Sequence, residues 1–268
     1  MHETAFAKIN LALHVRGRMP DGYHRIETVF AFCEDGDRLE ASEGDELELR
    51  LTGPFAGDLE ADPDNLVLRA TRALRERFAV DTGASLTLDK RLPVAAGIGG
   101  GSADAAAALR LLVRWWRLEA DETLLLDIAR GLGADVPACL SSRPARGEGR
   151  GDELAPIDEP ALAGAPLLLV NPGVPLSTAA VFAGWDGVDR GPLGDWREGR
   201  NDLEPAASRL VPAIREVLAA LSEAQFARLS GSGATCFGLY ETEAGRDAAA
   251  VRIRAARPSW WTLATRLR

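Results

Sequence analysis

Alternating apolar and polar residues predict that the chain begins with a β-strand. In residues 5–15, Ile9, Leu11 and Leu13 alternate with more polar positions, which is the two-residue period of a half-covered strand. A lysine in the middle of such a strand, here Lys8, is most often a solvent-facing residue, so the pattern alone does not make it functional. Similar patterns or short apolar runs predict further strands at residues 27–33, 46–52, 84–90, 167–170 and 260–265, and one entered from 229–237.

Helical spacing of apolar residues predicts helices between these strands. One should begin at Asp62-Pro63, as N-cap and first helical residue. Ser102 is expected to cap a long alanine-rich helix, and Asp135 a short turn with a proline just inside. Further helices are expected at residues 125–132, 177–182, 203–221 and 243–256. The Gly- and Trp-rich stretch 184–199 predicts a mobile loop, and residues 141–152 predict a loop or crossover.

A run of glycines precedes the alanine-rich helix. Four of the five residues at 97–101 are glycines, which suits a backbone that approaches another group closely or takes positive φ. Free N–H groups and a partial positive charge at the helix start make this an anion site, with phosphate as the usual occupant. A plain flexible turn is the alternative. A Walker A loop fits poorly, because Ser-Ala follows the last glycine. A dinucleotide fingerprint needs its glycines directly after a strand, and it fits poorly because Lys90-Arg91-Leu92-Pro93 intervenes.

Composition narrows the class of protein without naming a function. A chain of 268 residues with 46% hydrophobic content can bury a large core in one or two domains. Its net charge of −9 disfavours nucleic acid and anionic membranes as partners. The three cysteines are far apart and predict reduced thiols of a cytoplasmic protein, and the three histidines lack zinc-ligand spacing. Neither a signal peptide nor a membrane span is expected.

Three motifs in order carry a resemblance to a known family. They are AKINL at residues 7–11, PVAAGIGGGSADAA at 93–106 and LSGSGA at 229–234. Together they resemble the GHMP kinase superfamily of ATP-dependent small-molecule kinases. Further segments resemble those members whose acceptor is a cytidine diphosphate-linked polyol of isoprenoid precursor biosynthesis; these are GRMPDGYH at 17–24, GADVP at 133–137, PGV at 172–174 with Thr178 and Phe182, and NDLE at 201–204.

The resemblance implies an α+β fold in two domains. A ribosomal protein S5 domain 2-like, ATP-binding N-terminal domain would span residues 1–153. A ferredoxin-like, substrate-binding C-terminal domain would span residues 154–268, with the substrate in the cleft between them. ATP and Mg²⁺ would be required, and the partners would be small molecules rather than nucleic acid or membrane.

The resemblance also assigns roles to residues. Asp135 would be the general base that removes the acceptor proton, and Lys8 would contact both Asp135 and the acceptor hydroxyl. ATP would bind at Pro93, Val94, Ala95, Ala96, Gly97, Ile98, Gly99, Gly100, Gly101, Ser102 and Ala103. The acceptor would bind at Asn10, Tyr23, His24, Phe30, Thr178 and Phe182, where aromatic faces suit a cytosine ring.

One departure from the family pattern and two rival functions bear on this interpretation. Superfamily kinases often carry a second serine where this chain has Ala103, and no acidic residue is plainly a Mg²⁺ ligand. A kinase for homoserine or mevalonate-type alcohols would not need the aromatic residues at 23, 24 and 182. A non-catalytic nucleotide-binding module would not need both Lys8 and Asp135.

Overall fold

The computed structural model describes residues 1–58 and 64–268, which form two compact units interleaved along the chain. The first unit comprises residues 1–7, 35–94 and 99–142, and the second comprises 8–34, 95–98 and 143–268. The predicted helix start at Asp62-Pro63 lies outside the described residues. The predicted domain boundary after residue 153 stays a prediction.

The described strands confirm every strand expected from the sequence and add three. They are His2–Arg18 (β1), His24–Ser42 (β2), Leu47–Thr52 (β3), Ala84–Asp89 (β4), Ala145–Glu148 (β5), Glu153–Pro156 (β6), Pro166–Asn171 (β7), Phe226–Leu229 (β8), Cys236–Leu239 (β9) and Trp261–Arg266 (β10). The added strands are β5, β6 and β8. Two of them, β5 and β6, pair with each other. β5 lies within residues 141–152, where the sequence predicted a loop or crossover, and β6 begins directly after them. Both β5 and β6 are short and polar, so no hydrophobic period could reveal them.

The described helices are, in chain order, Leu66–Phe78 (α1), Gly100–Trp115 (α2), Glu122–Leu132 (α3), Val136–Ser141 (α4), Thr178–Ala183 (α5), Glu204–Leu210 (α6), Ala213–Ala220 (α7) and Glu243–Ala256 (α8). Two single turns of 3₁₀ helix lie at Ala56–Asp58 and Pro160–Leu162. No helix in the described part of the chain has the length and apolar character to cross a membrane.

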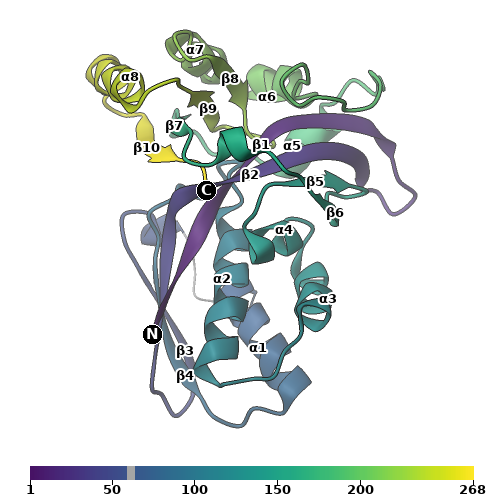
Figure 1. Cartoon of the computed structure of the whole chain (residues 1–268), viewed down its shortest axis with the longest axis vertical. Helices are drawn as coiled ribbons and strands as arrows, with labels where there is room; N and C mark the ends of the chain where they lie inside the picture. Colours follow the sequence, from purple (N-terminus) through teal and green to yellow (C-terminus); the bar gives the residue numbers. More distant parts are fainter. Residues whose placement is uncertain (59–63) are drawn as a thin grey trace. The chain divides into compact units, whose positions relative to one another are not determined.

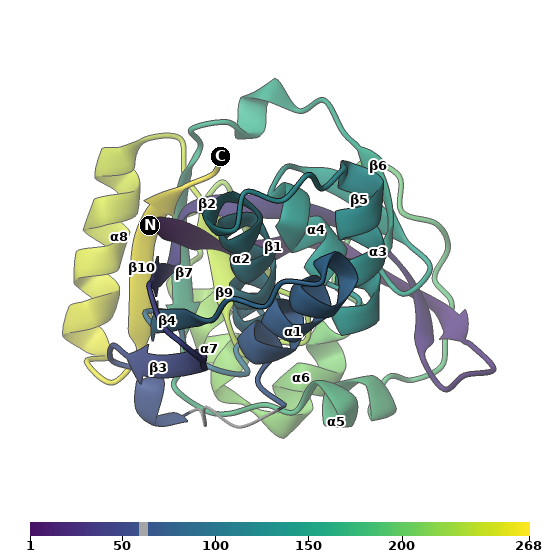
Figure 2. The ribbon, with the colours of Figure 1, turned by 90° about the horizontal axis from the view of Figure 1, so that it is seen from below.

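The first unit is built around helix α2. Ala105 to Ala108 are completely buried in it, and α2 contacts α1, α3 and α4 (Figure 2). Alanine side chains let these helices approach closely, and a helix buried on several sides needs no polar stripe. Strand β3 runs parallel to β4, which pairs antiparallel with residues 38–42 of β2. The start of α2 is therefore supported by a packed helical layer.

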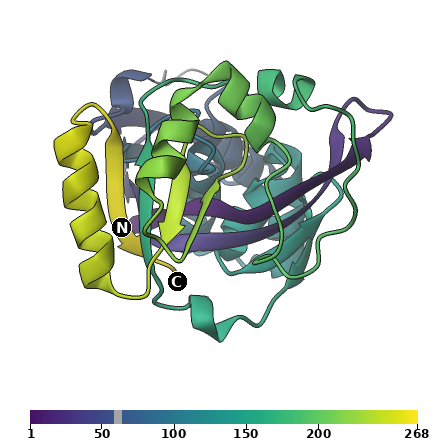
Figure 3. The same cartoon turned by 90° about the horizontal axis from the view of Figure 1, so that it is seen from above.

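The second unit contains an antiparallel sheet in the order β10-β7-β9-β8. Helices α7 and α8 lie on one face of it (Figures 1 and 3), and their apolar residues Ile214, Val217 and Ile253 are buried in its core. In the same unit, residues 28–30 of β2 pair with β5. The arrangement agrees with the α+β class predicted from the sequence.

Two predicted helix features are wrong for local reasons. Ser102 is not the N-cap of α2, because the helix begins at Gly100 and Gly99 is its N-cap, with a φ of 66°. Glycine takes this left-handed conformation without penalty, so the helix starts earlier than a serine cap would set. The helix predicted at 203–221 is two helices, α6 and α7, because Pro212 cannot donate the backbone hydrogen bond that would continue α6.

The loop at 184–199 is anchored by hydrogen bonds within the second unit. Leu193 N donates to Glu27 Oε2 at 2.6 Å, and Arg146 Nη2 donates to Leu193 O at 2.6 Å. Arg228 Nη1 donates to Trp196 O at 3.0 Å, and the Trp196 side chain is buried. These contacts hold a segment for which the sequence predicts mobility.

Candidate active site

Lys8 is buried on β1, contrary to the solvent-facing position that a mid-strand lysine usually takes. Only 3% of it is exposed, its Nζ donates to Asn10 Oδ1 at 2.9 Å, and its ammonium lies 5.1 Å from the centroid of the Phe30 ring. A buried ammonium is costly unless polar and aromatic neighbours compensate it. Lys8, Asn10 and Phe30, three of the predicted site residues, are therefore brought together.

Asn10 connects Lys8 to the second glycine loop at 230–233. Its Nδ2 donates to Thr28 Oγ1 at 2.8 Å, and its backbone N–H donates to Ser230 Oγ at 3.3 Å. Thr28 in turn donates to Ala12 O at 2.6 Å, so the Asn10 amide is fixed in one orientation. This orientation of the amide places Asn10 Oδ1 where it accepts the hydrogen bond from the Lys8 ammonium.

The middle of the glycine run (residues 93–103) is held against the second glycine loop at 230–233 by hydrogen bonds. In the second unit, Ser230 Oγ donates to Gly97 O at 2.8 Å, Thr235 N donates to Ala96 O at 3.1 Å and Lys8 N donates to Ile98 O at 3.0 Å. A Cβ on Gly97, whose φ is +75°, would lie 2.5 Å from Ser230 O. Glycine at 97 is thus required both by conformation and by the close approach of the two loops.

The C-terminal part of the glycine run lies in the first unit and forms the beginning of helix α2. The first four N–H groups of a helix have no partner inside the helix, and here they follow the glycine N-cap at position 99. Ser102 lies in the first turn rather than at the cap. Helix α2 has 16 residues, and its N-terminal end is a suitable place for phosphate oxygens.

An aromatic group in the second unit contains two predicted acceptor residues. The His24 ring lies 4.9 Å from the Phe182 ring, tilted by 33°, and 5.7 Å from the Trp185 ring, edge to face. Burial, and to a smaller extent the nearby Arg18 charge, lowers the pKa of His24 below its usual value. The imidazole is therefore neutral at pH 7 and can both donate and accept hydrogen bonds.

The other predicted acceptor residues have separate surroundings. Tyr23 is 54% exposed and lies under the Arg150 guanidinium, 5.1 Å from its ring centroid. Thr178, the first residue of α5, shares a 2.9 Å hydrogen bond with Ser232 of the second glycine loop. The ring of Tyr23 is therefore not part of the aromatic group of His24, Phe182 and Trp185.

Asp135 immediately precedes α4 in the first unit. Its backbone is αR-like, with φ −84° and ψ −16°, and its side chain makes no capping bond to α4. The sequence prediction of an N-cap position is confirmed, but the carboxylate does not serve as a cap. Pro137 in the first turn has no N–H, so the start of α4 has one donor fewer to be capped.

Several polar and aromatic residues at these places were not predicted from the sequence. Trp185 follows Phe182 by three positions, and this helical spacing could have revealed it. Ser230 and Ser232 lie in the LSGSGA motif at 229–234, whose sequence indicates no role for the two serines. Of the two carboxylates around Lys90, Asp104 lies in the 93–106 motif without an assigned role, and Asp37 left no sequence signal.

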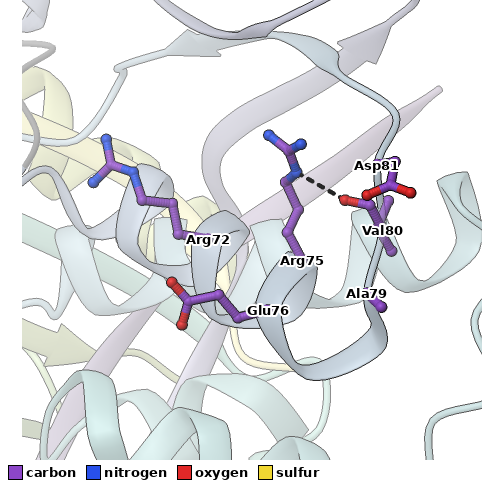
Figure 4. Close-up of a pocket in the computed structure, with 6 residues that line it drawn as sticks. All are labelled: Arg72, Arg75, Glu76, Ala79, Val80 and Asp81. Atoms are coloured by element: carbon purple, nitrogen blue, oxygen red, sulfur yellow. Dashed lines mark hydrogen bonds between the residues drawn. The ribbon is translucent and has the colours of Figure 1, made fainter.

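A hollow of about 310 Å³ lies at the end of α1 (Figure 4) and contains none of the predicted site residues. It is lined by Arg72, Arg75, Glu76, Ala79, Val80 and Asp81. Arg75 Nε donates to Val80 O at 3.1 Å and closes the C-terminal end of the helix. Within residues 1–58 and 64–268, no group of three or more His, Cys, Asp or Glu side chains is placed to hold a metal ion.

Two family descriptions match the chain. The GHMP kinases N terminal domain matches residues 65–143, and the GHMP kinases C terminal domain matches residues 189–258. Both matched ranges fall inside the respective domains predicted from the sequence.

Comparison with individual proteins is more specific. The chain is 56% identical over 281 aligned positions to the 4-diphosphocytidyl-2-C-methyl-D-erythritol kinase of Rhizorhabdus wittichii, covering 100% of this chain and 96% of the relative. A crystal structure of 4-(cytidine 5'-diphospho)-2C-methyl-D-erythritol kinase superposes with a TM-score of 0.85 at 33% identity, covering 100% and 99% of the two chains. The mevalonate kinase of Methanococcus jannaschii superposes with a TM-score of 0.74 at 11% identity, covering 100% and 98%, and shares the fold alone.

Proposed function

The chain belongs to the family of 4-diphosphocytidyl-2-C-methyl-D-erythritol kinases within the GHMP kinases, and we propose that it phosphorylates that cytidyl substrate. The terminal phosphoryl group of ATP would go to the 2-hydroxyl of 4-diphosphocytidyl-2-C-methyl-D-erythritol, a step of non-mevalonate isoprenoid precursor synthesis. The observation that carries the proposal is 56% identity over the whole chain to a relative of that name. The reaction would take place in the cytoplasm, which three buried cysteine thiols support.

ATP would bind at the glycine run, residues 93–103. The N–H groups at the start of α2 and the side-chain-free backbone before it would receive the phosphate oxygens. Mg²⁺, which kinase sites usually bind through one or two carboxylates and the substrate phosphates, would offset the charge of the triphosphate. That mode of binding needs one or two carboxylates and no cage of protein ligands.

Asp135 and Lys8 would carry the chemistry on the acceptor side. Phosphoryl transfer needs positioning and charge stabilisation more than covalent help from the protein. Asp135 would accept the proton of the 2-hydroxyl as the new bond to phosphorus forms. The Lys8 ammonium, oriented by Asn10, would stabilise the developing negative charge.

The cytosine ring would be bound by the aromatic group of His24, Phe182 and Trp185. The contact between His24 and Phe182 supports this assignment, because a flat heteroaromatic ring is bound by aromatic faces together with hydrogen-bonding groups. Asn10, Tyr23, Phe30 and Thr178 would complete the acceptor site. Neutral His24 offers both a donor and an acceptor to the polar edge of the base.

Replacing Phe182 by Ala should raise the KM for the acceptor about ten- to a hundredfold. This corresponds to a loss of about 1.4–2.8 kcal/mol of binding free energy from stacking and apolar contact together. Phe182→Leu is the matched control, because it keeps apolar volume against the core that Phe182 touches and removes only the aromatic face. Steady-state kinetics should show an intermediate acceptor KM for the leucine variant and a constant ATP KM for both. An equal rise in both KM values would contradict the assignment.

One incubation tests the function itself. The protein, ATP, Mg²⁺ and 4-diphosphocytidyl-2-C-methyl-D-erythritol should give a product heavier by one phosphoryl group in mass spectrometry. Free cytidine nucleotides should compete with the acceptor rather than with ATP. Efficient phosphorylation of 2-C-methylerythritol 4-phosphate, which lacks the cytidyl group, would overturn the substrate assignment, and so would activity on mevalonate or homoserine alone.

A further inference from the structure

Asp37, Lys90 and Asp104 form a buried charge cluster in the first unit. Lys90 Nζ donates to Asp37 Oδ2 at 2.5 Å and to Asp104 Oδ2 at 2.7 Å, and at most 3% of any of the three side chains is exposed. Buried ion pairs are weak contributors to stability, because desolvation offsets most of their attraction. General stability alone is therefore a poor explanation for this cluster.

The cluster joins the two flanks of the glycine run. Asp37 Oδ1 accepts hydrogen bonds from the backbone N–H groups of Arg91 at 2.6 Å and Leu92 at 2.8 Å, directly before Pro93. Asp104 lies on α2 just after the run. Lys90 bridges both carboxylates, so one ammonium connects the segment that enters the glycine run to the helix that leaves it.

Gly100, the first residue of α2, lies directly against this cluster. A Cβ added at Gly100 would be 3.4 Å from Lys90 Nζ and 3.9 Å from Asp37 Oδ2. The cluster thus lies beside the first residue of the helix, where the N–H groups without partners inside the helix begin.

We propose that Asp37, Lys90 and Asp104 are positioning residues for the nucleotide, which fix the two flanks of the glycine run so that the N–H groups of α2 converge on the ATP phosphates. The inference rests on the proposed function, since it takes ATP as the ligand of the glycine run. None of the three residues needs to touch ATP. Their role is to hold the backbone in the geometry that binds phosphate, which removes an ordering cost from binding.

The charges of the cluster decide which variants should fold. Two carboxylates surround one ammonium, and Asp104 Oδ1 has no hydrogen-bond partner among the described residues. Burial raises the pKa of Asp104 to about 7, with Asp37 adding to the rise and Lys90 opposing it. Removing the charge of Asp104 leaves a one-to-one pair of Lys90 with Asp37, so Asp104 variants should fold.

The test compares Asp104→Leu with Asp104→Asn. The leucine variant breaks the connection to α2, whereas the amide can still accept from Lys90. ATP KM, and the Kd of a non-hydrolysable ATP analogue measured by calorimetry, should rise about tenfold in Asp104→Leu. In Asp104→Asn the rise should stay within about threefold, and the acceptor KM should be unchanged in both variants. This split between the two substrates, with rescue by the amide, separates positioning from a purely structural role.

Glu3→Gln, on strand β1, is the matched control, because it removes a different ion pair to helix α2. Glu3 pairs with Arg110 of α2 at 2.9 Å, away from the glycine run, and it should change thermal stability without changing the ATP KM. If Asp104→Leu does not fold, Asp37→Asn replaces it, because that variant leaves Lys90 and Asp104 as a one-to-one pair and weakens the bonds to Arg91 and Leu92. It should raise the Kd of the ATP analogue at least about threefold.

Unchanged ATP affinity in the folded variants would overturn the inference, and so would an equal rise in both substrates' KM. Failure of the proposed function looks different, because the unmodified protein would then not phosphorylate the cytidyl acceptor. An active unmodified protein whose variants keep normal ATP affinity refutes the positioning role alone.

Discussion

Replacing Asp135 by Asn is expected to lower kcat about 10²- to 10⁴-fold, with the affinity for ATP little changed. The amide keeps the shape of the side chain but cannot accept the proton of the attacking hydroxyl. Since the Asp135 carboxylate makes no capping bond to α4, its loss should cost the helix little. The deficit should therefore appear in kcat rather than in protein stability, measured by steady-state kinetics alongside thermal unfolding.

Asp121 provides the matched control for this variant. It also precedes a helix of the first unit, but its Oδ1 accepts a hydrogen bond from Leu124 N at 2.7 Å and caps α3. Asp121→Ala should lose about 1 kcal/mol of stability with normal kcat, the reverse of Asp135→Asn. A variant at Asp135 with near-normal turnover would remove the residue from the role of general base.

The elements and motifs of this chain were predictable where information is local. The alternation around Lys8 predicted β1, and the glycine run predicted a loop leading into a helix. The helix start was misplaced because Ser102 is a good cap in general, whereas the φ that Gly99 adopts depends on the fold. The break between α6 and α7 was visible as Pro212 in the sequence, but the apolar spacing on both sides of it suggested a single helix.

Contacts between distant residues were not predictable in the same way. Asp37 and Lys90 are separated by 53 positions, and nothing in either segment indicates that they meet. Ser230 reaches Gly97 across 133 positions, so its role in holding the glycine run appears only in the fold. The exposure of Lys8 was also undetermined locally, because an alternating strand does not reveal which face is covered.

The pairing of Lys8 with Asn10 is a further feature that the fold alone reveals. Both residues lie on β1 and point to the same face, as their two-residue separation requires. Thr28 of β2 holds the Asn10 amide, and the Lys8 ammonium lies over the Phe30 ring of the same strand. The cation is thus fixed by neighbours on both strands before any substrate binds, as electrostatic stabilisation of a transition state requires.

Lys8→Met should therefore lower kcat about 10²- to 10³-fold, the usual effect of removing one preorganised group that stabilises developing charge. Methionine keeps the length of the side chain and its contact with the Phe30 ring, so the loss is that of the ammonium. Asn10 Oδ1 loses its 2.9 Å donor, which should also cost about 1–3 kcal/mol of stability. Asn10→Leu, which removes the orienting partner but keeps the cation, should fold with a smaller loss of kcat. If Lys8→Met turns over as fast as Asn10→Leu, the charge of Lys8 has no role in the transfer and the lysine is there only to satisfy Asn10.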